Sequence, residues 1–181
     1  MAKPVIATTS LAGCFGCHMS LLDIDERILE LIELVEFNKS PIDDIKTFTQ
    51  KCDIGLIEGG CCNHENIEVL KDFRKNCKVL VSVGECAIMG GLPALRNDIS
   101  IKECLAEAYL DGPTTVNPDG VLPNDAELPM LLNKVYPCHE IVKIDYFIPG
   151  CAPNADLIWD ALVALINNKP AELPYEVFKF D

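Results

Sequence analysis

Cysteine is the residue type in this chain whose number and spacing could do chemistry, because thiolates bind metal ions and iron-sulfur clusters. Ten cysteines occur among 181 residues. Cys14 and Cys17 form a Cys-x2-Cys pair, and Cys86 and Cys151 stand alone at later points of the chain. A close pair with two distant single cysteines supplies the four thiolates that a 4Fe-4S cluster needs. These four residues are therefore the first candidates for a binding site.

Other thiol chemistries remain open on this spacing. Zinc also accepts four thiolates, but structural zinc sites usually draw on two closely spaced ligand pairs, and only Cys14 with Cys17 has that form. The same pair could be a thioredoxin-like redox site, which leaves Cys86 and Cys151 without a role. A disulfide framework is disfavoured, because such frameworks belong mainly to small secreted domains that lack a sufficient core.

The elements that would position these thiols alternate between short apolar strands and helices. Strands are predicted at residues 5–9, 54–58, 79–83 and 142–148, and their nearly continuous apolar character indicates burial on both faces. Helices are predicted at residues 21–35, with Ser20 as N-cap, and at 66–75, 101–110 and 153–166. The pattern predicts one α/β domain over residues 1–181, with an irregular excursion at about 111–137 and a tail at about 167–181.

The strands sort the cysteines by position. Ligand sites in open parallel sheets lie outside the carboxyl ends of the strands, and six cysteines follow predicted strands: Cys14, Cys17, Cys61, Cys62, Cys86 and Cys151. Eight of the 11 glycines lie in the same turns, where they allow backbone N–H groups to approach an anionic cluster. Cys52 and Cys77 precede strands, roughly 15 Å from that edge, so they cannot share the site. Cys104 and Cys138 are expected to be structural.

Composition and charge restrict the partners. Hydrophobic residues make up 49% and charged residues 24% of the chain, and the formal net charge is -13. A chain this acidic is not expected to bind nucleic acid, which requires cations that neutralise phosphates. No apolar run approaches the ~18 to 20 residues that span a bilayer, and no export signal is visible, so we expect a cytoplasmic protein without direct membrane insertion.

Four sequence blocks resemble a known family. They are Leu-Ala-Gly-Cys-Phe-Gly-Cys at 11–17, Glu-Gly-Gly at 58–60, Val-Gly-Glu-Cys-Ala-Ile-Met-Gly-Gly at 83–91 and Ile-Pro-Gly-Cys-Ala-Pro at 148–153. Their order and content resemble the cluster-binding blocks of nickel-iron hydrogenase small subunits. Segments at 23–27, 104–109, 136–140 and 145–150 look most similar to the small subunits of the soluble NAD-reducing hydrogenases. The related quinone-reductase subunit of respiratory complex I has adjacent cysteines in the first block, whereas two residues separate them here.

The resemblance implies a flavodoxin-like three-layer sandwich with a parallel sheet and one proximal 4Fe-4S cluster on Cys14, Cys17, Cys86 and Cys151. It also implies a large subunit with the nickel-iron centre, and diaphorase subunits with FMN and further iron-sulfur clusters, so that the complex acts as a hydrogen:NAD oxidoreductase. The chain itself would relay electrons and carry no catalytic residue. One cluster is expected because the chain ends soon after the fourth block, whereas longer relatives append a domain with two more.

Several alternatives accompany this prediction. The chain could be the small subunit of an F420-reducing or a sulfur-reducing hydrogenase, or a flavodoxin-like module that holds FMN in the loop 8–16. Cys61 and Cys62 are expected to be structural thiols, although oxidation could bring them to the cluster. His18 is expected to be a surface histidine, with an interface or proton-path role as the alternative. Glu58 lies at a strand end beside the predicted cluster, and the sequence leaves open whether it is a structural residue, a polar interface residue or part of a proton path.

Overall fold

Five parallel strands form the central sheet in the computed structural model, which describes residues 2–173 and 175. The strands are β1 (Val5–Ser10), β2 (Glu36–Phe37), β3 (Cys52–Glu58), β5 (Cys77–Val83) and β7 (Tyr146–Ile148). Their order across the sheet is β2-β1-β3-β5-β7, and every neighbouring pair is parallel. Counted along the chain, this is the 2-1-3-4-5 order of flavodoxin-like sheets. The predicted fold class is confirmed.

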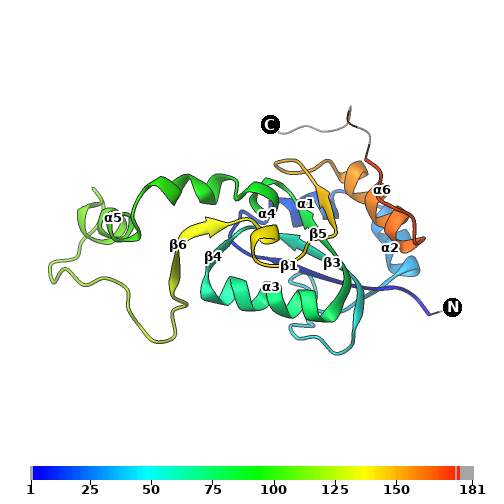
Figure 1. Ribbon diagram of the computed structural model, residues 1–181, viewed down its shortest axis with the longest axis horizontal. Coiled ribbons are helices and arrows are strands. Elements are labelled where there is room, and N and C mark those ends of the chain that lie inside the picture. The colour runs from blue at the N-terminus through cyan, green and yellow to red at the C-terminus, as the bar shows by residue number, and fades with distance from the viewer. Residues whose placement is uncertain (1, 174, 176–181) are drawn as a thin grey trace.

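Helices cover both faces of the sheet (Figure 1). On one face lies α3 (His64–Asn76), and on the other lie α1 (Gly16–Leu22), α2 (Arg27–Leu34) and α6 (Ala155–Ile166). Successive residues of β3 point to opposite faces of the sheet. Leu56 packs in the core beneath α1, α2 and α6, whereas Ile57 packs with the α3 side chains. Burial on both faces explains why the strands are nearly continuous apolar runs.

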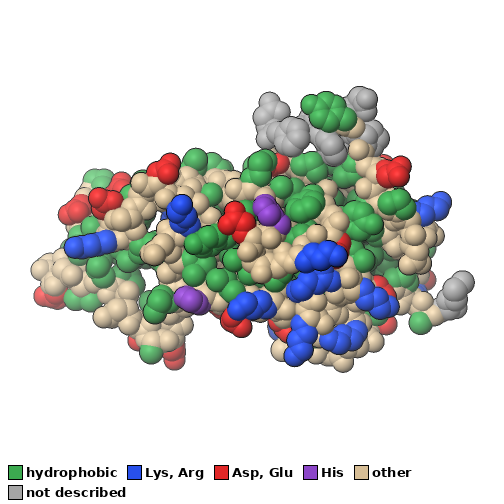
Figure 2. Space-filling view, in the orientation of Figure 1, with side chains coloured by type: hydrophobic (Ala, Val, Ile, Leu, Met, Phe, Trp, Pro, Cys, Tyr) green, Lys and Arg blue, Asp and Glu red, His purple; other side chains and the backbone are tan. Residues whose placement is uncertain are grey.

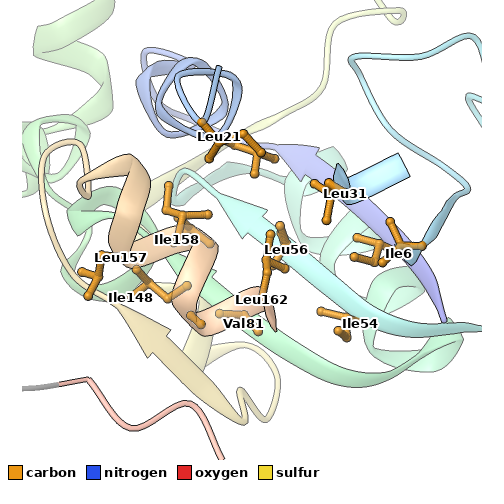
Figure 3. Close-up of a cluster of buried hydrophobic side chains, with 14 residues drawn as sticks. Ile6, Leu21, Leu31, Ile54, Leu56, Val81, Ile148, Leu157, Ile158 and Leu162 are labelled. Atoms are coloured by element: carbon orange, nitrogen blue, oxygen red, sulfur yellow. The ribbon is translucent and has the colours of Figure 1, made fainter. Parts of the chain in front are cut away.

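The core between the sheet and α1, α2 and α6 is a single cluster of aliphatic side chains (Figure 3). Leu21 of α1, Leu31 of α2 and Leu162 of α6 meet Ile6 and Leu56 of the sheet in this cluster. Each such side chain contributes roughly 1.5 to 3 kcal/mol when it is removed from water. The face therefore holds α1, which carries Cys17, firmly against the sheet.

The strand register brings the carboxyl ends of four strands to the same level. Ser10 of β1 is the register partner of Glu58 in β3, Glu58 is the partner of Val83 in β5, and Val83 is the partner of Ile148 in β7. The four loops that follow these residues therefore leave the sheet side by side. These are the loops in which the predicted ligands lie.

A second, two-stranded sheet extends the molecule at one end (left in Figure 1). It pairs β4 (Cys61–Asn63) with β6 (Leu131–Tyr136) in the antiparallel direction. Between β5 and β6 the chain forms α4 (Glu85–Met89), the 3-10 turn η1 (Leu92–Asp98), α5 (Ile101–Ala106) and the π-helical turn η2 (Glu107–Asp111). A further 3-10 turn, η3 (Cys138–Glu140), follows β6. The prediction of an irregular excursion at 111–137 was therefore wrong for β6, whose largely exposed residues lack a buried-strand pattern.

Three predicted elements differ from the structure in their bounds. The helix predicted at 21–35 is two helices, because the chain turns between Leu22 and Arg27 and Asp25 has a positive φ of 55°. Ser20 lies inside α1, and its hydroxyl donates to the Pro153 carbonyl instead of capping a helix. The strand predicted at 142–148 covers only Tyr146–Ile148, and α6 begins at Ala155, after Pro153.

The remaining helix predictions lie close to the observed elements. The helix predicted at 66–75 is α3, which begins at His64 because the Asn63 side chain accepts a hydrogen bond from the Asn66 N–H at 2.8 Å. The helix predicted at 101–110 is α5 and its π-helical continuation. Of the predicted tail, Ala171 and Leu173 pack against the core, while residues 174 and 176–181 lie outside the described residues.

Charge is distributed unevenly over the surface. Many Lys and Arg side chains gather over the side of the molecule that carries α3 (Figure 2), although the chain as a whole has a net charge of -13. Arg74 of α3 pairs with Asp145 at 2.6 Å, and Lys78 pairs with Asp53 at 2.6 Å. In the described part of the chain, no helix has the length and apolar character needed to cross a bilayer.

Candidate metal centre

The four predicted ligands lie in two loops and two helix starts at the carboxyl edge of the sheet. Cys14 follows β1, Cys17 lies in the first turn of α1, Cys86 lies in α4 after β5, and Cys151 follows β7. Cys14 and Cys151 are exposed, whereas Cys17 and Cys86 are half-buried. The edge therefore exposes two of the thiols and keeps the other two partly within the protein.

Hydrogen bonds join these loops to one another. The Glu85 N–H donates to the Gly150 carbonyl at 3.1 Å, and the Gly150 N–H donates to Glu85 Oε1 at 3.3 Å. The Ser20 hydroxyl of α1 donates to the Pro153 carbonyl. The loop of Cys151 is thus tied to the start of α4 on one side and to α1 on the other.

Two glycines allow the thiols to lie directly on the backbone. A Cβ atom at Gly84 would lie 2.3 Å from Cys17 Sγ, and one at Gly91 would lie 2.9 Å from Cys86 Sγ. Both distances are far shorter than van der Waals contact, which is about 3.5 to 4.0 Å between carbon atoms. Gly84 also has a φ of 81°, a backbone conformation that residues other than glycine rarely adopt. Glycine is required here for space as well as for conformation.

The four thiols share one electrostatic environment. Burial, Glu58 and the neighbouring thiolates of Cys86, Cys14 and Cys151 raise the pKa of Cys17, in that order. Burial and the thiolates of Cys151 and Cys14 likewise raise the pKa of Cys86. Four adjacent thiolates repel one another, so they need a cationic group to hold them in the charged form. The donor set therefore fits a thiolate-bound metal group.

The arrangement also bears on the size of that group. Within residues 2–173 and 175, no three His, Cys, Asp or Glu side chains are placed to bind one metal ion. The four thiolates of a 4Fe-4S cluster bind four different iron atoms, so they surround a larger body than a zinc site does. The chemistry of the donor set thus fits the cluster.

Cys52 and Cys77 lie at the opposite edge of the sheet. They are the first residues of β3 and β5 and are register partners of each other. The six residue steps of β3 place Cys52 roughly 20 Å from Glu58 at ~3.3 Å per residue. The prediction that these two thiols are remote from the carboxyl edge is confirmed.

The pair at 61 and 62 contacts other parts of the molecule. Cys61 is fully buried on the α3 side in the same cluster as Cys138, whose Sγ donates to the Gly59 carbonyl at 3.4 Å, and Cys62 Sγ donates to Asn66 Oδ1 at 3.3 Å. Neither thiol is among the charged groups that act on Cys17. The expectation of structural thiols therefore fits both residues, and Cys138 is buried as predicted, while Cys104 is half-buried.

A series of buried, hydrogen-bonded polar side chains lies beside the four thiols. Glu58 and His18 are only 3% and 4% exposed, and His18 Nδ1 makes a short hydrogen bond to Glu58 Oε2. His18 Nε2 lies 3.0 Å from Thr8 Oγ1, which lies 2.7 Å from Ser40 Oγ. The prediction of a surface histidine was wrong. The adjacency of His18 to Cys17 was visible in the sequence, but no local pattern indicated its partners 10 and 40 residues away.

The last residues of β1 and the segment after β2 border a cavity of about 170 Å³, lined by Thr8, Thr9, Ser10, Lys39, Ser40, Pro41 and Lys46. Cofactor and ligand pockets usually measure about 300 to 1,000 Å³. The cavity is smaller than a site for a whole FMN molecule. The four-thiol edge is thus the better developed of the two candidate sites.

Comparisons with known proteins show which family the chain resembles in sequence and structure. The family model described as "NADH ubiquinone oxidoreductase, 20 Kd subunit" matches residues 14–165. The chain is 49% identical to the delta subunit of the NAD-reducing hydrogenase HoxS of Cupriavidus necator, over 99% of the chain and 86% of that protein. It is 38% identical to one subunit of the F420-non-reducing hydrogenase of Methanothermobacter thermautotrophicus, over 96% of the chain but only 57% of that longer protein. A solved structure titled as an NAD+-reducing [NiFe]-hydrogenase in the H2-reduced state matches with a TM-score of 0.94 and 50% identity, over 99% of both chains.

Proposed function

The chain belongs to the family of the NADH ubiquinone oxidoreductase 20 Kd subunit and is a homologue of the small subunit of NAD-reducing nickel-iron hydrogenase, and on this basis we propose that it carries one 4Fe-4S cluster and relays electrons. The proposed ligands are Cys14, Cys17, Cys86 and Cys151. The observation that carries the proposal is the convergence of these thiols, from distant sequence positions, at one sheet edge. A thiolate-bound cluster supplies reversible one-electron storage.

The residues around the thiols account for binding and tuning. Burial of Cys17 and Cys86 keeps water from part of the site, while the exposed Cys14 and Cys151 leave the other part open for a partner. The Gly16 N–H donates to Cys14 Sγ at 3.4 Å, and hydrogen bonds of this kind influence the reduction potential of a cluster. The protein thus fixes the ligands and leaves one side free for electron exchange.

The proposed partners follow from the relatives. The homologue is one subunit of a larger hydrogenase, so a large subunit is the expected partner at the exposed thiols. We infer that this large subunit holds the nickel-iron centre that oxidises H2, and that diaphorase subunits with FMN and further clusters pass the electrons to NAD. The complex would act in the cytoplasm, where NAD is available. In this scheme the chain contains no catalytic residue.

NAD is the proposed final acceptor. The identity of 49% to the NAD-reducing relative exceeds that of 38% to an F420-non-reducing relative and 26% to a coenzyme F420 hydrogenase subunit. The acceptor is decided by partner subunits, so the purified complex has to be tested with H2 and NAD, coenzyme F420 or sulfur in turn. Reduction of F420 or sulfur without reduction of NAD would refute this part of the proposal.

Metal and sulfide analysis of the purified complex tests the cluster itself. We expect iron and acid-labile sulfide attributable to this chain and an EPR signal on reduction. Replacement of any one proposed ligand by serine should abolish or strongly alter this signal, whereas Cys62→Ser, a half-buried thiol that contacts Asn66, should leave it unchanged. Zinc without iron, or flavin bands without iron and sulfide, would overturn the proposal.

A further inference from the structure

Glu58 caps a helix that belongs to a different part of the chain. It is the last residue of β3, and its carboxylate accepts hydrogen bonds from the Cys17 N–H at 3.3 Å and the His18 N–H at 3.2 Å. These amides lie in the first turn of α1, whose own N-cap residue, Phe15, makes no side-chain hydrogen bond. Glu58 therefore satisfies amides that a helix start leaves without partners.

The carboxylate is held on its other side by a series of hydrogen-bonded side chains. With Nδ1–H of His18 donating to Glu58, Nε2 accepts the hydroxyl proton of Thr8, and Thr8 accepts from Ser40. All four residues are buried, with exposed fractions between 0% and 4%. Because each of these four side chains has a hydrogen-bond partner, the carboxylate of Glu58 has one fixed position. A buried polar network that is fully satisfied is rigid.

The fixed carboxylate lies against the proposed ligands and not against solvent. Among the charges that act on Cys17, Glu58 has the largest effect, and it also acts on Cys86. A buried negative charge interacts far more strongly with a neighbouring charge than the same charge does in water. Addition of an electron beside this carboxylate is therefore disfavoured.

We propose that Glu58 is a positioning residue that fixes the Cys14–Cys17 turn through two amides and keeps the reduction potential of the bound cluster low through its charge. This inference rests on the proposed function, because it requires a cluster at the four thiols. The two parts of the role are separable. A glutamine at this position retains one of the two oxygens, so it can still accept from one of the two amides, but it removes the charge.

An EPR-monitored redox titration of the hydrogenase complex, copurified with its partner subunits, tests the proposal. Glu58→Gln, which keeps an acceptor for one amide, should retain more iron and sulfide than Glu58→Ala and shift the midpoint potential of this cluster to more positive values. Glu58→Ala should lose cluster content, because it lacks both the acceptor and the charge. An unchanged potential in Glu58→Gln, or loss of its cluster from a folded chain, overturns the proposal.

Two further variants keep the test decisive. Asp53→Asn removes a carboxylate from the same strand, five positions earlier and roughly 16 Å away, and should leave the potential unchanged. Glu58→Asp retains the charge and should retain the low potential, so an upward shift in this variant overturns the role of the charge even where Glu58→Gln fails to fold. Absence of a cluster from the wild-type chain is a different result, which refutes the proposed function itself.

Discussion

Gly84→Ala tests the geometry of the proposed cluster site through a single added methyl group. Gly84 precedes α4 with φ 81° and ψ 162°, a region that costs other residues about 1 to 3 kcal/mol. The added Cβ would lie 2.3 Å from Cys17 Sγ, so the sulfur must retreat by about 1 Å to reach ordinary contact. Metal–ligand distances tolerate deviations of only about 0.2 Å. We therefore expect a folded chain that has lost most of its cluster.

Gly120→Ala is the matched control for this prediction. Gly120 also has a positive φ, of 62°, but a Cβ atom there would meet no atom within 4 Å. Both variants carry backbone strain, and only Gly84→Ala displaces a proposed ligand. The assay is iron and sulfide per chain with the EPR spectrum of the reduced complex, and urea unfolding reports the cost in stability. Wild-type cluster content in Gly84→Ala would refute the placement of the cluster against Cys17.

Three predictions concern the scaffold, each measured by urea unfolding. Asp145→Asn should lower the free energy of unfolding by about 1 to 3 kcal/mol, because Arg74 loses its carboxylate. Burial opposes ionisation of Asp145, but hydrogen bonds from Arg74 and from the Leu80 N–H lower the pKa of its carboxyl. The stabilisation by Asp145 is therefore present above about pH 4 and lost on acidification. If the variant loses stability in acid as steeply as the wild type does, the prediction is contradicted. Leu162→Ala should cost about 2 to 5 kcal/mol, since Leu162 is 1% exposed, and a cost under 1 kcal/mol argues against its burial. Asn63→Ala should cost about 0.5 to 2 kcal/mol by uncapping α3, whereas Asn63→Asp should cost less.

Some features of the site were predictable because they depend on local sequence. The apolar runs that became β1, β3 and β5 are local patterns, and the cysteines and glycines that follow them mark the carboxyl edge of a parallel sheet. Alternation of strands and helices was sufficient for the α/β class, whereas the flavodoxin-like topology was implied by the resemblance of the four sequence blocks. The remote position of Cys52 and Cys77 followed from strand length alone.

Pairings between distant segments could not be predicted in this way. Half of the residues of β6 are exposed, and the strand pairs with β4, a three-residue strand 70 residues earlier that has no periodic pattern of its own. The break between α1 and α2 preserves the burial of Leu21 and Leu31, so the apolar spacing looks the same for one helix as for two. Local periodicity does not contain this information.

The amino-acid sequence was sufficient to identify the thiols that leave the carboxyl edge of the sheet, because that edge is defined by strands that can be recognised locally. The burial of His18, and its position between Glu58 and Thr8, became evident only from the packed fold. Burial of a polar side chain depends on partners that satisfy its hydrogen bonds, and here those partners are on two other strands. Residue type and spacing identify the thiols, but the environment that tunes them is assembled only when β1, β3 and α1 pack together.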